Sequence, residues 1–179
     1  RFRVEAETIR DIFLHASGLL SQEVGGPSVF PPTSPDVVAL TYNSNVRWQT
    51  SEGGNRYRRG LYTFFKRTAP HPNLTTFDCP DSNVSCLRRD RSNTPLGALT
   101  TMNNEVFVEA AKALATLSFA ISPKPDHKSL ETTFKRVLSR APSEEEIGIL
   151  SQLASEARLF YQNHPSESET LFPNDLASE

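Results

Sequence analysis

The spacing of apolar residues at the start of the chain predicts an amphipathic helix over residues 3–17. The apolar side chains recur at helical spacing and share one face: Val4, Ile9, Ile12, Phe13 and Ala16. Gly18 follows, where glycine commonly ends a helix. A second helix is predicted over residues 55–67, with an apolar stripe made of Tyr57, Leu61, Phe64 and Phe65.

Between these two segments the helical pattern is interrupted. The stretch QEVGGPSVFPPTSPDVVAL, residues 22–40, contains two glycines and four prolines, which are incompatible with regular helix. We expect an extended, polyproline-like loop laid over the core. The run VVALTY, residues 37–42, adds at most a short strand.

The second half of the chain is expected to form helices that begin at recognisable capping residues. The expected caps are Ser92 or Asn93 before Pro95, Asn103 or Asn104 before residue 105, and a Ser143–Glu146 capping box. The corresponding helices are a short one after Pro95, then 105–119, 128–139 and a last one that ends near Gln162.

The fold class is therefore mainly α, an irregular helical domain with long Pro/Gly-rich loops and at most a short strand or hairpin. We predict one domain over residues 1–162 and an acidic, partly mobile tail over residues 163–179. The chain has 179 residues, enough for one full core. It contains no apolar run of the roughly 18 residues that a membrane-spanning helix needs. No signal peptide is visible, but the chain opens on a helical pattern, so we expect Arg1 to be an internal start.

Charge is unevenly distributed along the chain. Residues 47–91 carry eight Arg and one Lys against four acidic residues, a net charge of +5, whereas residues 141–179 have a net charge of −7. This asymmetry indicates either an anionic partner or packing of the two halves on each other. Nucleic acid is not the expected partner, because the basic residues are mixed with acids and prolines and no nucleic-acid motif is present.

Three arginines precede the predicted helix start at Asn93. Arg88, Arg89 and Arg91 carry planar donors suited to carboxylate, sulfate or phosphate, and a helix N-terminus adds free N–H groups. Together with Tyr57, Arg58, Arg59 and His71 they predict an anion site. The alternative is structural ion pairing, in which Asp78, Asp81, Asp90 and the acidic tail neutralise these arginines.

Other candidate side chains have two interpretations each. Trp48, the single tryptophan, is either a stacking platform for a sugar or an anchor for its loop. Asp78 and His71 are candidates for an acid–base pair. Cys79 and Cys86 either form a local disulfide in an oxidising compartment or remain two reduced thiols in a cytosolic protein. No metal spacing and no C-x-x-C-H haem motif occurs in the chain.

Five stretches of the chain stand out together: RFRVEAETIRD at the start, GGPSVFPP at 25–32, YRRGLYTFFKRT at 57–68, TTFD at 75–78 and RSNTPLGAL at 91–99. With these motifs the chain resembles the domain of unknown function 1553 family, found mainly in planctomycetes and related bacteria. The resemblance covers residues 1–160 in the right order.

The resemblance implies an extracytoplasmic, periplasmic or secreted, location and a chain that is a fragment of a larger protein. In that family the domain commonly follows a c-type cytochrome domain, so any haem would belong to an N-terminal domain outside this chain. The implied partners are neighbouring domains or chains of the same protein, and the genomic company of polysaccharide-degrading enzymes suggests an anionic carbohydrate.

The residues and the resemblance together lead to one expectation and one alternative. The expectation is a module that helps to bind an anionic or carbohydrate substrate. Its arginines Arg58, Arg59, Arg88 and Arg91 would bind anionic groups, together with Asn93 at the predicted helix start. The aromatic rings of Trp48 and Tyr57 would stack, and Asp78 or His71 would move protons. The alternative is a structural module that docks a neighbouring catalytic or haem domain and has no activity of its own.

Overall fold

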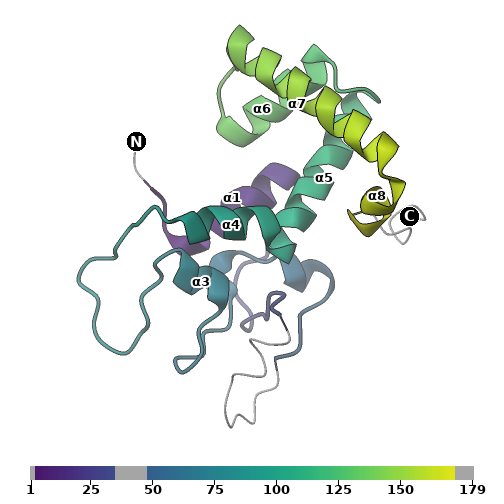
Figure 1. The fold of residues 1–179 in the computed structure, drawn as a ribbon. Coiled ribbons are helices and arrows are strands. Elements are labelled where there is room, and N and C mark those ends of the chain that lie inside the picture. Colours follow the sequence, from purple (N-terminus) through teal and green to yellow (C-terminus); the bar gives the residue numbers. More distant parts are fainter. Residues whose placement is uncertain (1–2, 35–47, 172–179) are drawn as a thin grey trace. The chain divides into compact units, whose positions relative to one another are not determined.

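The protein is described by a computed structural model that covers residues 3–34 and 48–171 (Figure 1). Its elements are α1 (Ala6–Ser17), the 3₁₀ turns η1 (Gly53–Tyr57) and η2 (Gly60–Tyr62), α3 (Pro72–Thr76), α4 (Pro95–Asn103), α5 (Glu105–Ile121), α6 (His127–Leu138), α7 (Glu144–Asn163) and α8 (Pro165–Leu171). The mainly α fold class is confirmed. The predicted strand over residues 37–42 lies outside the described residues.

The chain divides into two compact units, residues 1–115 and 116–179, and the boundary falls within α5. The prediction of a single domain over residues 1–162 stays a prediction. Helix α8 lies within the segment predicted to be an acidic tail. None of the helices in the described part of the chain is both long and apolar enough to cross a membrane.

The core of the first unit lies between α1, α3 and the start of α5. One cluster of its buried side chains consists of Ala6, Leu74, Phe77 and Phe107. The ring of Phe107 lies 4.6 Å from that of Phe13 and meets Phe77 edge-on at 6.0 Å. The predicted apolar face of α1 is thus confirmed for Ile9 and Phe13, which pack against this cluster, and for the buried Ala16. It is wrong for Ile12, which is 43% exposed.

Buried arginines hold the described segments between α1 and α3 together by donating hydrogen bonds to backbone carbonyl oxygens. Arg58 is 1% exposed and donates to the carbonyl oxygens of Pro27, at 3.1 Å, and of Gly25. Its guanidinium lies 3.9 Å from the ring centre of Tyr62, whose hydroxyl accepts from the N–H of Gly25 at 2.8 Å. A parallel bridge between Val29 and Thr63 joins the same two segments. Arg58 therefore fixes the glycine loop to η2, and the described part of the chain has no sheet that could do so.

The helix predicted over residues 55–67 is wrong: this segment forms η1, η2 and an extended run. In a helix the N–H of Gly60 would bond to the carbonyl of Arg56. Instead, Asp11 of α1 accepts from the Gly60 N–H at 2.6 Å, and Arg10 of α1 donates to the Arg56 carbonyl at 2.7 Å. Both partners of the helical hydrogen bond are thus taken by side chains of α1.

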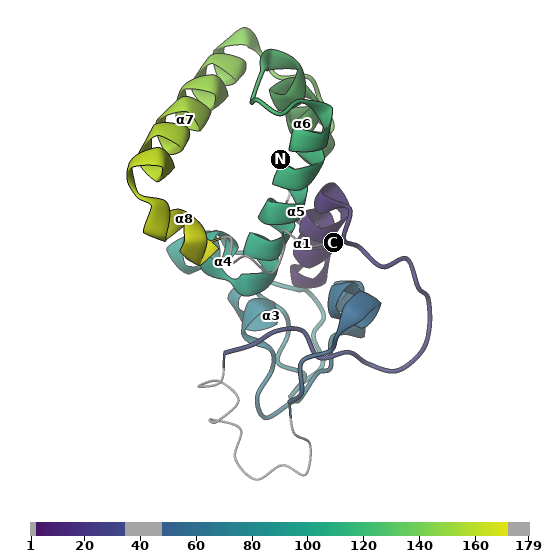
Figure 2. The ribbon, with the colours of Figure 1, turned by 90° about the vertical axis from the view of Figure 1, so that its right-hand side faces the viewer.

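In the second unit α6 and α7 form a helical hairpin. The capping box predicted at Ser143 and Glu146 is confirmed, and Arg140 binds the Glu146 carboxylate at 2.6 Å. These contacts lower the pKa of Glu146 to about 2, and the hydrogen bond from Arg140 contributes most. The chain bends between α7 and α8, where Pro165 begins the new helix (Figure 2).

Gly60 offers a test of how closely the η segment packs on α1. A Cβ at this position would lie 2.6 Å from the carbonyl oxygen and 2.8 Å from the Cα of Glu7. Because both atoms belong to the backbone, Gly60→Ala should lower the free energy of unfolding by about 2 kcal/mol or more. Urea unfolding followed by the fluorescence of Trp48 measures this change.

Gly54→Ala is the matched control for this substitution. Gly54 lies in η1, and a Cβ added to it would have no other atom within 4 Å, so alanine there should leave stability nearly unchanged. Equal effects of the two substitutions would contradict the close approach of Gly60 to α1.

Candidate functional site

The loop between α3 and α4 is closed at its base by a single carboxylate. Asp78, which adopts a left-handed backbone with φ 63°, accepts from the backbone N–H of Ser92 at 2.6 Å and from its hydroxyl at 2.9 Å. These hydrogen bonds lower the pKa of Asp78, and the one from the Ser92 backbone contributes most. Two residues later Thr94 caps α4 by accepting from the N–H of Gly97. The cap predicted at Ser92 or Asn93 is therefore wrong by one or two positions, because Ser92 is engaged by Asp78.

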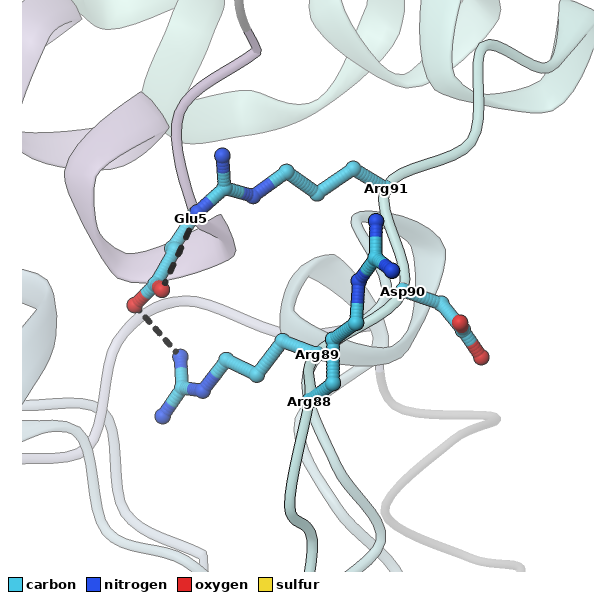
Figure 3. Close-up of a pocket in the computed structure, with 5 residues that line it drawn as sticks. All are labelled: Glu5, Arg88, Arg89, Asp90 and Arg91. Carbon is cyan, nitrogen blue, oxygen red and sulfur yellow. Dashed lines mark hydrogen bonds and ion pairs between the residues drawn. The ribbon is translucent and has the colours of Figure 1, made fainter.

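The loop carries an open pocket of about 520 Å³ (Figure 3). Its lining residues are Glu5, Arg88, Arg89, Asp90 and Arg91. Arg89 and Arg91 both extend toward Glu5, with nitrogen–oxygen distances of 3.0 and 3.6 Å, while the carboxylate of Asp90 points away (Figure 3). The structure thus brings the predicted residues Arg88 and Arg91 into one pocket, next to the segment that begins α1.

Arg88 differs from the other two arginines of the pocket. Its side chain is exposed and has no ion-pair or hydrogen-bond partner among residues 3–34 and 48–171. Arg89 is bound by Glu5 and, at 2.8 Å, by Glu7. Three guanidinium groups face two carboxylates in the lining, so the pocket has a formal charge of +1. It can offer an incoming anion one unengaged guanidinium.

The predicted disulfide between Cys79 and Cys86 is not formed in the structure: both cysteines are free. Cys79 is half-buried against the core, 3.8 Å from a carboxylate oxygen of Glu7, whereas Cys86 is exposed and lies 3.1 Å from the carbonyl oxygen of Arg88. Burial, with the nearby Glu7 charge, raises the pKa of Cys79 to about 11. A thiol in this state is a poor nucleophile.

His71 is a buried structural side chain with both ring nitrogens engaged. Its Nε2 donates to the carbonyl oxygen of Pro32 at 3.1 Å, and its Nδ1 accepts from the backbone N–H of Asn73 at 3.2 Å. Burial lowers the pKa of His71 to about 4. The imidazole is therefore neutral at physiological pH, with no free nitrogen for proton transfer.

Trp48 and Tyr57 are both half-buried, and each interacts with other residues of the first unit. The indole N–H of Trp48 donates to the carbonyl oxygen of Pro31 at 2.9 Å, and its ring meets Phe30 edge-on at 5.2 Å and His71 at 5.5 Å. The interpretation of Trp48 as a loop anchor fits these contacts. Tyr57 ends η1, and burial raises the pKa of its hydroxyl.

The other predicted ligand residues do not line the pocket and have partners elsewhere. Arg58 is committed to the glycine loop, and Arg59 is paired with Asp11 at 2.9 Å. Asn93 accepts a hydrogen bond from Arg3 at 3.3 Å. The predicted anion site thus separates into the loop pocket and a set of structural arginines.

Structural ion pairing was the alternative for the arginines, and the structure corrects the partners expected there. The carboxylates that bind Arg56, Arg59, Arg89 and Arg91 come from α1, the residue before it and α5, instead of from Asp78, Asp81 or Asp90. They are Glu5, Glu7, Asp11, Glu105 and Glu109. Sequence reasoning missed them, although the excess of arginine over residues 47–91 signals that compensating acids lie elsewhere in the chain. The acidic residues near the end of the predicted tail lie outside the described residues.

Comparison with known proteins identifies the family. The sequence model of the family described as "Protein of unknown function (DUF1553)" matches residues 1–154, which include every residue of the loop pocket. The chain belongs to this family. No curated protein and no solved structure matches it. Within the described residues of this DUF1553 domain no group of three or more His, Cys, Asp or Glu side chains is placed to hold a metal ion.

The buried His71 should make the stability of the DUF1553 domain depend on pH. Its pKa is about 4 in the folded chain and about 6.5 when unfolded, so between these values the unfolded chain binds more protons. The free energy of unfolding should rise with pH across this window, by about 3 kcal/mol in all. Urea titrations at pH 4.5, 5.5, 6.5 and 7.5 measure the slope.

His71→Gln should flatten this slope, whatever it does to stability at neutral pH. His15→Asn, at an exposed position of α1, should retain it. A slope that survives in His71→Gln would show that other groups dominate this window.

The two thiols should differ in reactivity. With an aromatic disulfide reagent at pH 8, one equivalent should react quickly and one at least about tenfold more slowly, because Cys79 is half-buried and its pKa is raised to about 11. Cys86→Ser should abolish the fast phase. If neither thiol reacts until the protein is reduced, the two cysteines are bridged in the native protein.

Proposed function

We propose that this DUF1553 domain is a binding module that receives an anionic group in the loop pocket. The observation that carries the proposal is Arg88, an exposed guanidinium with no partner in the described part of the chain, held beside two further arginines in an open pocket. Planar guanidinium groups bind carboxylate, sulfate and phosphate through paired hydrogen bonds. A ligand that reaches Arg88 comes within the field of Arg89 and Arg91 as well.

The ligand class that suits the pocket is an anionic carbohydrate. The pocket is open and its lining is polar, which favours a hydrated ligand over an apolar one. Glu5 and Asp90 weaken the attraction, so we expect selectivity for a compact charge and a modest affinity. The resemblance to the family supports the wider setting of the proposal. In that setting the module belongs to a larger extracytoplasmic protein, with any c-type haem in another domain.

Binding is favoured over catalysis by the roles of the candidate catalytic groups. Both nitrogens of His71 are bonded, Asp78 holds the base of the loop, and the thiol of Cys79 is kept protonated. The alternative function, docking a neighbouring domain, is supported by a separate feature, the exposed apolar face of α7.

Arg88→Gln tests the proposal directly. Tetragalacturonate and sodium sulfate, titrated into the ¹⁵N-labelled chain, should shift the backbone amide resonances of residues 79–94 with a dissociation constant on the order of millimolar. Arg88→Gln should weaken binding about fivefold or more, and added salt should weaken it further.

Two further variants sharpen this test. Arg67→Gln, at an exposed arginine without a partner in the described residues, should leave affinity unchanged. Glu5→Gln should raise affinity, because it removes one negative charge from the pocket and frees Arg91, while Arg89 keeps its ion pair with Glu7. Equal losses in the Arg88 and Arg67 variants would reduce the binding to nonspecific charge attraction and overturn the proposal.

A further inference from the structure

Helix α7 presents a line of large apolar side chains to solvent. Ile149, Leu153 and Phe160 are 60%, 60% and 48% exposed. Spacings of four and seven residues place all three on one face of the helix. Ile147, which is 7% exposed, lies on a different face, so the exposed line is not the side of α7 that its own unit buries.

The second unit has little core of its own to offset this exposure. Among its described side chains Ile147 is the one apolar residue that is buried. Helices of 12 and 20 residues gain most of their stability from a buried apolar face, and one buried isoleucine supplies only about 2 kcal/mol. The exposed line on α7 is therefore where the unit would gain stability from a partner.

Charge on the same face indicates which partner fits. Glu145 lies four residues before Ile149, and Glu156 lies three residues after Leu153, so both carboxylates border the apolar line. Both are exposed. The basic residue of α7, Arg158, follows Ile149 by nine residues, which is two and a half turns, and so lies on the opposite side of the helix. At 100° per residue both carboxylates lie on the same side of Ile149, Leu153 and Phe160, so the apolar line has one acidic edge.

We propose that this face of α7 docks a basic amphipathic helix of a partner polypeptide. Its apolar stripe would cover Ile149, Leu153 and Phe160, and its flanking lysines or arginines would meet Glu145 and Glu156. A second copy of this chain fits poorly, because it would bring the same carboxylates to the face and leave Arg158 on the far side. The inference is independent of the loop pocket and of the anion proposed to bind there.

Two synthetic peptides of 18 residues test the proposal with the full chain. One carries an apolar leucine stripe flanked by lysines, and the other has the same stripe flanked by glutamates. Fluorescence anisotropy at 0.15 M salt should show at least tenfold tighter binding of the leucine–lysine peptide. Equal affinities for the two peptides would overturn the proposal.

Variants of α7 distinguish peptide binding at this face from nonspecific attraction of a basic peptide to an acidic chain. Leu153→Glu should weaken binding of the leucine–lysine peptide at least tenfold, whereas Ser155→Glu, at an exposed position outside the apolar line, should not. The double variant Glu145→Lys, Glu156→Lys should reverse the preference in favour of the leucine–glutamate peptide. Circular dichroism checks that each variant keeps its helix content. Unchanged preference in the double variant would overturn the assigned role of the two carboxylates.

Light scattering tests whether a second copy of the chain, instead of a basic partner, covers the apolar face of α7. The chain should be monomeric at micromolar concentration, with or without Leu153→Glu. A dimer that Leu153→Glu dissociates would show that a second copy occupies the face, and would overturn the proposal of a basic partner.

Discussion

The carboxylates of α1 determine how the basic half of the first unit folds. Asp11 binds both Arg59 and the backbone N–H of Gly60, and Glu7 binds Arg89 across 82 residues of sequence. These contacts set the path of two segments that lack regular secondary structure of their own. Such pairs are worth most where several charges are linked and partly buried, as they are between α1, η2 and the loop. Without them the residues after Gly53 would be free to follow their helical pattern.

Buried arginine has a second role here, as a donor to backbone carbonyls. Arg58 and Arg10 together bond the carbonyl oxygens of Pro27, Gly25, Arg56 and Arg58 itself. A buried backbone carbonyl without a partner costs free energy, and a loop rich in proline has few N–H groups with which to bond it. Guanidinium groups supply those donors from the side. These donors hold the described segments between α1 and α3, residues 18–34 and 48–71, where no sheet supplies hydrogen bonds.

The helices that could be predicted from the sequence are those whose hydrogen bonds stay local. Apolar spacing and nearby capping residues were enough for α1, α4, α5, α6 and α7, apart from the cap of α4. The segment 55–67 could not be predicted, because its bonding partners on α1 lie 46 to 49 residues away in the sequence. Short α3 lacks a periodic pattern. The same distinction between local and nonlocal contacts holds for the loop pocket. Adjacency in sequence brought Arg88 and Arg91 together, whereas the contact with Glu5 is nonlocal.

Glu5 lines the pocket and also forms ion pairs that hold the loop against the start of α1, and this double role limits how strongly the pocket can bind an anion. An anion that displaced Glu5 from Arg89 and Arg91 would exchange one carboxylate for another at similar cost, leaving Glu7 to hold Arg89 against α1. Arg88 changes this balance, because it adds an attraction that Glu5 does not already satisfy. Affinity in the pocket should therefore come from ligands that can place acidic oxygens on Arg88 and beside Arg89 and Arg91 at the same time. A single carboxylate would gain little, whereas a sulfate or an oligomer of acidic sugars could contact both.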